Sequence, residues 1–81
     1  MFVVVSYDIV NDRRRNKIAD TLENYGTRVQ KSVFECILDH SRLARLVEEA
    51  TKLLKEEEDT LRVYRICDSC LSKGKYMELG S

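Results

Sequence analysis

Residues 2–8, FVVVSYD, form a nearly unbroken run of β-branched and aromatic side chains that ends in a carboxylate. Such a run is typical of a central strand that is covered on both of its faces. Successive side chains of a strand point to opposite faces, and residues 2–5 are all apolar. The rest of the chain must therefore cover this strand from two sides.

The segment after this strand alternates between helical and extended patterns. Asn11 or Asp12 can cap a helix, and Gly26 is expected to close it as the residue just past its end. Residues 27–38, TRVQKSVFECIL, are rich in Val, Ile and Phe and indicate strand. This stretch is long for one strand, and a break near residues 31–32 would divide it into two.

A second helix and two further strands are expected after this stretch. Asp39 or Ser41 can cap an amphipathic helix that continues to Lys55. Residues 56–59 are acidic and lie at the negative end of that helix dipole, so fraying is expected there. Two more stretches have strand patterns, at residues 60–66 and, as a short strand, at about residues 75–79.

The order of these elements predicts an α+β, ferredoxin-like βαββαβ sheet with a short extra C-terminal strand. All 81 residues are expected to form a single domain. Both helices of this fold lie on one face of the sheet, which leaves the other apolar face bare. A bare apolar face is a sticky patch, and a second copy of the chain is its simplest cover. We therefore expect a homodimer.

The charges of the chain cancel in total but are unevenly distributed. Fourteen basic and fourteen acidic residues exclude a uniformly basic protein. Residues 13–31 carry a net charge of +4 and residues 48–59 a net charge of −4. This asymmetry predicts one side that faces anions and an opposite, solvated side; two ordinary charged helix surfaces are the alternative.

The sequence also predicts where the protein works. No apolar run approaches the roughly 20 residues that a membrane helix needs. No basic segment or cleavage site precedes the first strand pattern, so no export signal is recognised. We expect a cytoplasmic protein that does not enter a membrane.

Asp8 is the sharpest chemical feature, because it stands where a buried strand emerges. A carboxylate here can also simply start the following turn. A hard cation such as Mg²⁺ needs several oxygen ligands, and one carboxylate holds it poorly. Two copies of Asp8 that face each other across a dimer axis would supply the missing charge, so the metal site and the homodimer are one linked hypothesis. Tyr7 beside it is either packed or orients a water molecule.

Three consecutive arginines, Arg13, Arg14 and Arg15, are expected in the first turn of the first helix. The helix dipole penalises cations there by roughly 0.3–1 kcal/mol each. A local rule broken three times often marks function, and guanidinium groups at a helix N-terminus can bind phosphate. A solvated basic patch is the alternative. Arg28 and Lys31, with Phe34 nearby, combine charge with an aromatic ring, an arrangement that suits nucleic acid, although Phe34 alone also suits a core position.

The cysteines give only a weak signal. Cys67 and Cys70 form a lone C-x-x-C pair, which with Cys36 and His40 could complete a zinc site. Cys36, however, is expected to be packed in a strand, and His40 is expected in a surface loop. No helix pattern follows the pair, as thioredoxin-like redox chemistry would require.

Four runs of residues resemble one known family in order and over nearly the whole chain. They are VSYDI at residues 5–9, RRNKIA at 14–19, YGTRVQKSVFEC at 25–36 and RVYRIC at 62–67, which Cys70 follows. These runs are similar to the small CRISPR-associated adaptation endonuclease family, the partner of the spacer integrase.

The resemblance implies a ferredoxin-like homodimer in which the C-terminal strand, at about residues 75–79, pairs with the partner subunit. It also implies that the doubtful stretch after the first helix is two strands. The implied activity is metal-dependent cleavage of RNA or DNA during the acquisition of new spacers, with Asp8 of each subunit binding the metal. The positions that match the family and would support substrate or site are Tyr7, Arg15, Lys17, Arg28 and Phe34.

Two other functions remain open at this point. One is a non-catalytic architectural dimer that bridges integrase subunits and grips DNA, for which Arg14 and Arg15 would matter more than Asp8. The other is a sensor of a small ligand, but no glycine-rich ligand loop is present. The sequence does not separate RNA from single-stranded or duplex DNA as the substrate.

Overall fold

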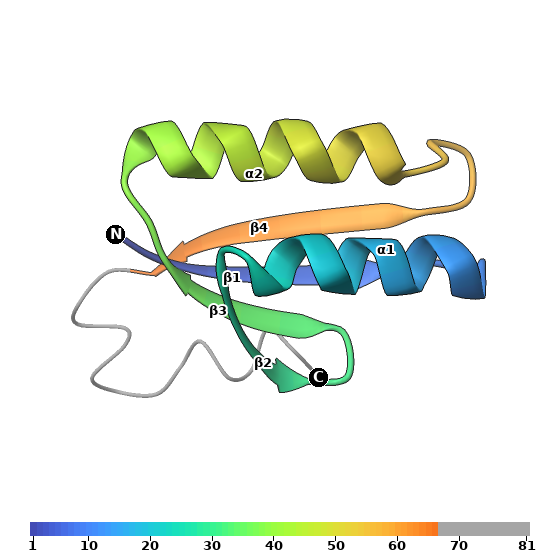
Figure 1. Cartoon of the computed structure of the whole chain (residues 1–81), viewed down its shortest axis with the longest axis horizontal. Coiled ribbons are helices and arrows are strands. Elements are labelled where there is room, and N and C mark those ends of the chain that lie inside the picture. Colours follow the sequence, from blue (N-terminus) through green and yellow to red (C-terminus); the bar gives the residue numbers. More distant parts are fainter. Residues whose placement is uncertain (67–81) are drawn as a thin grey trace.

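The computed structural model describes residues 1–66 of the chain. The expected strand at residues 75–79, together with Cys67 and Cys70, lies outside the described residues. The elements, in order, are β1 (Phe2–Asp8), α1 (Asp12–Glu23), β2 (Gly26–Gln30), β3 (Val33–Ile37), α2 (His40–Leu53) and β4 (Thr60–Ile66) (Figure 1). The predicted βαββαβ order is confirmed, and the stretch at residues 27–38 is indeed two strands joined by a turn at residues 31–32.

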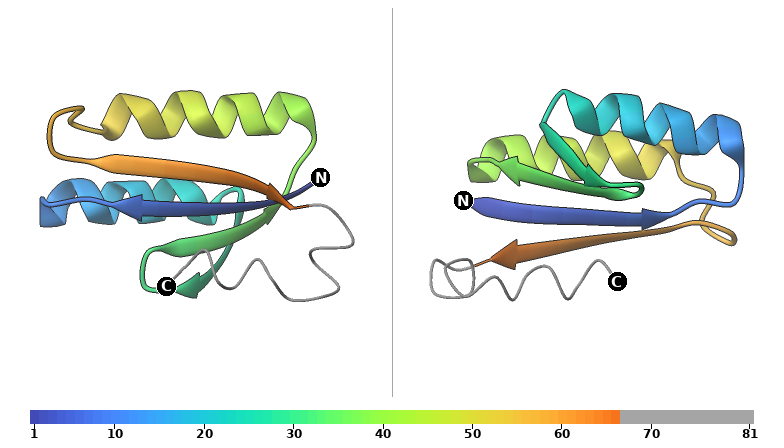
Figure 2. Two further views of the ribbon diagram at one scale, coloured as in Figure 1. Left: turned by 180° about the vertical axis from the view of Figure 1, so that it is seen from behind. Right: turned by 90° about the horizontal axis from the view of Figure 1, so that it is seen from below.

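The four described strands form one sheet in the order β2-β3-β1-β4, and every neighbouring pair is antiparallel. β1 is therefore central, as its apolar run predicted. Both helices lie on the same side of this sheet (Figure 2). The arrangement is the predicted ferredoxin-like fold; the homodimer stays a prediction.

The two faces of β1 have different surroundings. Val3, Val5 and Tyr7 are buried and pack in the core between the sheet and the helices. Burying each such large side chain stabilises the fold by roughly 1.5–3 kcal/mol. On the opposite face, Phe2 pairs across the strands with Ile37, which is 80% exposed. No helix of residues 1–66 covers this second face, which we call the open face. Ile37 is exposed on it, whereas Val4 and Val33 on the same face are buried.

Local capping explains where both helices begin. The side chain of Asn11 accepts a hydrogen bond from the backbone N–H of Arg14, and Asp39 does the same for the N–H of Arg42. These side chains satisfy N–H groups that have no partner within the helix. His40 is consequently the first residue of α2 rather than part of a loop, which corrects the expectation from sequence.

Gly26 has a different role from the one predicted for it. α1 already ends at Glu23, and Gly26 is the first residue of β2. A Cβ atom at this position would overlap the carbonyl oxygen of Glu35 and the Sγ of Cys36. The glycine is therefore needed for close approach of β2 to β3 rather than for ending a helix.

The segment between α2 and β4 is a defined turn instead of a frayed helix end. α2 ends at Leu53, two residues earlier than predicted, and residues 56–58 form a turn. The side chain of Asp59, which follows, is fully buried. Its Oδ2 accepts hydrogen bonds from Arg14 Nε at 2.8 Å and from the backbone N–H of Lys55 at 2.9 Å. Its Oδ1 accepts from the N–H of Val10 at 3.2 Å and from Arg14 Nη2 at 3.4 Å.

This Asp59 cluster corrects the predicted separation of charge. Arg14 belongs to the basic segment and Asp59 to the acidic one, yet the two side chains are paired. Arg14 Nη2 also lies 3.5 Å from a carboxylate oxygen of Glu58. The basic start of α1 and the acidic turn before β4 are thus in contact and do not form opposite sides of the molecule.

The Asp59 cluster predicts how stability depends on pH. The hydrogen bonds of Arg14, with those of the two backbone N–H groups, lower the pKa of Asp59 from 3.8 to about 2. The carboxylate form therefore stabilises the folded state fully above a pH of about 4, and this stabilisation is lost as the pH falls toward about 2. An Asp59→Asn variant, whose amide would turn one N–H donor toward other donors, should lower Tm at neutral pH by roughly 5 °C or more.

Thermal unfolding of both proteins across this pH range measures the effect. The difference in Tm between wild type and Asp59→Asn should shrink as the pH falls below about 4. The matched control is Glu57→Gln, because Glu57 is an exposed acid of the same turn with no ion pair in the described part of the chain. A pH-independent difference, or one that Glu57→Gln reproduces, would contradict the assignment.

Candidate functional site

Asp8 is the last residue of β1, and its side chain is exposed at the end of the sheet. It lies on the same face of β1 as Phe2, that is, on the open face, and it pairs across the strands with Thr60 of β4. Within residues 1–66 its carboxylate has neither a hydrogen bond nor an ion pair. An exposed carboxylate with no partner is free to bind a cation or to polarise a ligand.

A hollow of about 220 Å³ lies at this end of the sheet. It is lined by Tyr7, Asp8, Ile9, Arg15, Lys31 and Ser32. Arg15 is fixed there, because one of its nitrogens donates to the carbonyl oxygen of Ile9 at 3.0 Å and another contacts the carboxylate of Asp12. The hollow therefore combines one free carboxylate with two cations.

Tyr7 lines the hollow from the core side of the sheet. Its ring is almost fully buried and packs near the ring of Phe34, with 6.3 Å between the centroids. Its hydroxyl donates to the carbonyl oxygen of Lys31 at 3.4 Å, which ties β1 to the turn between β2 and β3. This contact makes Tyr7 a positioning residue for the Lys31 side of the hollow; its predicted role in catalysis stays a prediction.

Arg28 and Phe34 form the predicted pair of charge and ring, but the geometry is unlike the one expected. The guanidinium carbon of Arg28 lies 5.4 Å from the centre of the Phe34 ring, a cation–π distance. Phe34 itself is fully buried, so a base cannot stack on it, and the core position that its sequence also suited is the correct interpretation. The ring holds the exposed Arg28, which remains available for phosphate.

The other predicted cations are spread out. Arg14 faces Asp59 and is neutralised within the chain, so a structural role accounts for it. Lys17 is exposed on α1 and does not line the hollow. Lys31 does line it. The sequence had placed Lys31 with Arg28 and Phe34 in an arrangement that suits nucleic acid, and this role stays a prediction.

The donor chemistry of Asp8 suits a hard divalent cation but supplies only one ligand. No group of three or more His, Cys, Asp or Glu side chains gathers anywhere in residues 1–66. Mg²⁺ commonly uses one or two carboxylates and completes its shell with water and substrate phosphate. Asp8 therefore fits Mg²⁺ as part of a shared site, with further oxygens from substrate or from a second copy of the chain.

Neither Cys36 nor His40 supports the zinc alternative. Burial in the core raises the pKa of the Cys36 thiol to about 11, which disfavours the thiolate that zinc requires. His40 is exposed at the start of α2, and the two remaining cysteines lie outside the described residues.

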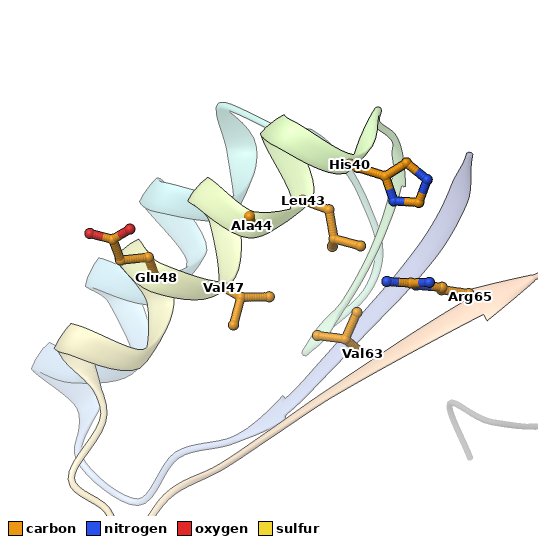
Figure 3. A pocket seen from close by; sticks show the side chains of 7 residues that line it. All are labelled: His40, Leu43, Ala44, Val47, Glu48, Val63 and Arg65. Carbon is orange, nitrogen blue, oxygen red and sulfur yellow. The ribbon is translucent and has the colours of Figure 1, made fainter.

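A second hollow, of about 570 Å³, separates α2 from β4 (Figure 3). Leu43, Val47 and Val63 give it an apolar lining, and Val63 and Arg65 point from β4 toward the helix. Its charged groups stand apart, because Glu48 lies at the end remote from Arg65. This groove lacks the combination of an unpaired carboxylate and two cations that lines the hollow beside Asp8. Within residues 1–66, no helix is long and apolar enough to cross a membrane.

Fold and site together define a small ferredoxin-like protein with an unpaired carboxylate set among cations at the end of its central strand. Comparison with known proteins identifies the family. The family model for the CRISPR-associated protein Cas2 matches residues 1–74. The chain therefore belongs to the Cas2 family, as its sequence runs predicted.

Individual relatives agree with this assignment. The chain is 52% identical over 71 residues to the CRISPR-associated endoribonuclease Cas2 1 of Chloroflexus aurantiacus, a match covering 86% of this chain and 76% of the relative. It is 40% identical over 82 residues to the CRISPR-associated endonuclease Cas2 of Halalkalibacterium halodurans, covering 95% and 85%. A chain in the solved structure of a partial Cas6-RT-Cas1–Cas2 complex matches with a TM-score of 0.78 and 29% identity, covering 88% of this chain and 83% of that chain.

The burial of Tyr7 predicts that its ring matters more for stability than its hydroxyl. Tyr7→Ala should lower the free energy of unfolding by roughly 3–5 kcal/mol, as for other large aromatic core residues. Tyr7→Phe keeps the ring and loses one long hydrogen bond, so its cost should stay near roughly 1 kcal/mol. Urea unfolding of the two variants checks this order, and an equal cost for both would show that the hydroxyl, not the ring, carries the contribution.

Proposed function

We propose that this protein is a metal-dependent endonuclease that hydrolyses phosphodiester bonds of RNA or DNA during the acquisition of new spacers. The observation that carries the proposal is the unpaired Asp8 carboxylate, which shares a hollow with Arg15 and Lys31. The endonuclease and endoribonuclease names of its relatives support the activity. The proposed place of work is the cytoplasm, and the proposed partner is the spacer integrase, since a similar chain occurs in a complex with a Cas1-containing protein.

The proposal includes a homodimer formed through the open face. Ile37 is largely exposed there, and burial of such an apolar side chain favours association. Asp8 lies on the same face. A two-fold axis near the Asp8 end would bring two carboxylates together and double the ligands for one Mg²⁺.

Each group in the hollow then has a task. Asp8 holds the metal, and a bound Mg²⁺ supplies Lewis-acid polarisation of the phosphate and a more acidic water. Arg15 and Lys31 bind the phosphate oxygens and offset the charge that develops on them. Arg15 comes to this task already oriented by the carbonyl of Ile9, and Tyr7 keeps the Lys31 turn in place.

A non-catalytic, architectural role beside the integrase is the second candidate, and the Cas1-containing assembly favours it. In that case Asp8 would be dispensable and the cations would grip DNA. DNA binding in that role is tested by charge-reversal variants at Arg15 and Lys17. Charge reversal at Arg14 is unsuitable, because it would break the pair with Asp59 and unfold that end of the protein.

The decisive variant is Asp8→Asn, which keeps size and removes the charge. With Mg²⁺ present, cleavage of labelled RNA and DNA by this variant should fall by roughly 100-fold or more, the scale on which loss of one key electrostatic group slows a reaction. Wild-type cleavage should stop when EDTA removes the metal. Asp20→Asn, the same change at an exposed acid of α1, is the matched control and should cleave normally.

The oligomeric state is measured in the same samples by sedimentation. Wild type and Asp8→Asn should both be dimers, because the proposed role of the two carboxylates is to bind the metal and not to stabilise the dimer interface. A monomeric wild type, or an Asp8→Asn protein with full metal-dependent cleavage, would refute the catalytic proposal. Spacer integration that proceeds normally with Asp8→Asn would show that the architectural role suffices.

A further inference from the structure

The open face is polar at one end and apolar at the other. At the Asp8 end, Ser6 and Asp8 both lie on this face of β1, and their cross-strand partners on β4 are Arg62 and Thr60. Farther along the sheet the same face carries apolar pairs, among them Phe2 with Ile66. One carboxylate, one guanidinium and two hydroxyls are thus concentrated in a single corner of the sheet.

The alternation of β4 fixes the side on which Arg62 lies. Val63 and Arg65 point from β4 toward α2 (Figure 3). Side chains at odd and even positions of a strand lie on opposite faces, so Arg62 points away from the helices, as Asp8 does. Arg62 is exposed, and the described part of the chain offers it neither an ion pair nor a hydrogen bond.

The spacing between Arg62 and Asp8 suits an anion that bridges them. The two residues are diagonal neighbours on adjacent antiparallel strands, a relation that sets their Cα atoms roughly 7–8 Å apart. Direct pairing would have neutralised both charges, and the structure shows none. A phosphodiester group has several oxygens, so one of them can meet a cation held by Asp8 while another accepts hydrogen bonds from Arg62.

We propose that Arg62 is a substrate-binding residue that holds the phosphodiester group next to Asp8. The hydroxyl of Ser6, its partner across the strands, lines the path between the two charges. This assignment rests on the proposed nuclease function and extends the site from the hollow of Arg15 and Lys31 onto the open face. The substrate phosphate then lies between cations from three separate segments of the chain.

The test compares Arg62→Gln with Arg65→Gln, the same change on the other face of the same strand. Binding of a labelled single-stranded RNA or DNA oligonucleotide is followed by fluorescence anisotropy in EDTA, so that it depends on neither metal nor cleavage. Arg62→Gln should weaken binding by about tenfold and reduce the slope of log K against log salt by about 1, because one phosphate contact is lost. Arg65→Gln should leave both unchanged.

Arg62→Lys keeps the charge and should recover most of the affinity and the salt slope. Wild-type affinity in Arg62→Gln, or an equal loss in Arg62→Gln and Arg65→Gln, would overturn the assignment, since the effect would then be absent or one of net charge. Cleavage by the wild type in Mg²⁺ is measured separately. A wild type that binds but does not cleave would refute the nuclease proposal, and the Arg62 result would still stand or fall on binding alone.

Discussion

The buried carboxylate of Asp59 is the interaction on which this end of the molecule depends. It joins the segment before α1, the first turn of α1 and the end of α2, through Val10, Arg14 and Lys55. Burying a charge is costly unless its lone pairs are satisfied, and here four N–H donors satisfy them. Thr60 follows Asp59 directly and pairs with Asp8. The cluster that holds the β1–α1 and α2–β4 connections together therefore also positions the strand residue next to Asp8.

The two faces of the central strand β1 have different roles, one in the stability of the core and one in the candidate site. Val3, Val5 and Tyr7 on one face form the floor of the core, while Asp8 stands on the other. Because the strand is buried on the core side and paired on both edges, the backbone that carries Asp8 is held within the sheet. The turn at Lys31 is held to the same strand by the Tyr7 hydroxyl, which keeps acid and cation in one hollow.

Local signals in the sequence were enough to predict the order of the helices and strands in the described part of the fold and the exposed position of Asp8 at the end of β1. The apolar run at residues 2–8 predicted the central strand. The sequence offered Asn11 or Asp12 and Asp39 or Ser41 as helix caps, and the structure selects Asn11 and Asp39. Tertiary choices were not predictable. Residues 56–59 are four acids in a row, and tertiary contacts, above all the pair with Arg14 45 positions away, select Asp59 for burial. In the sequence Gly26 likewise looks like the residue that ends a helix, and only its close contact with β3 in the fold shows why glycine is needed there.

The three arginines at the start of α1 are unfavourable for the helix dipole, and they are not all there for the same reason. Arg14 offsets its unfavourable position at the helix N-terminus by pairing with Asp59, whereas Arg15 bonds to the carbonyl of Ile9 and lines the hollow. Part of the basic run is therefore structural and part is open to ligand. The same division lets a chain with no net charge present a local group of cations at one hollow. Exposed charges act over about 8 Å at physiological salt, so the cations that line the hollow act mainly on groups close to it.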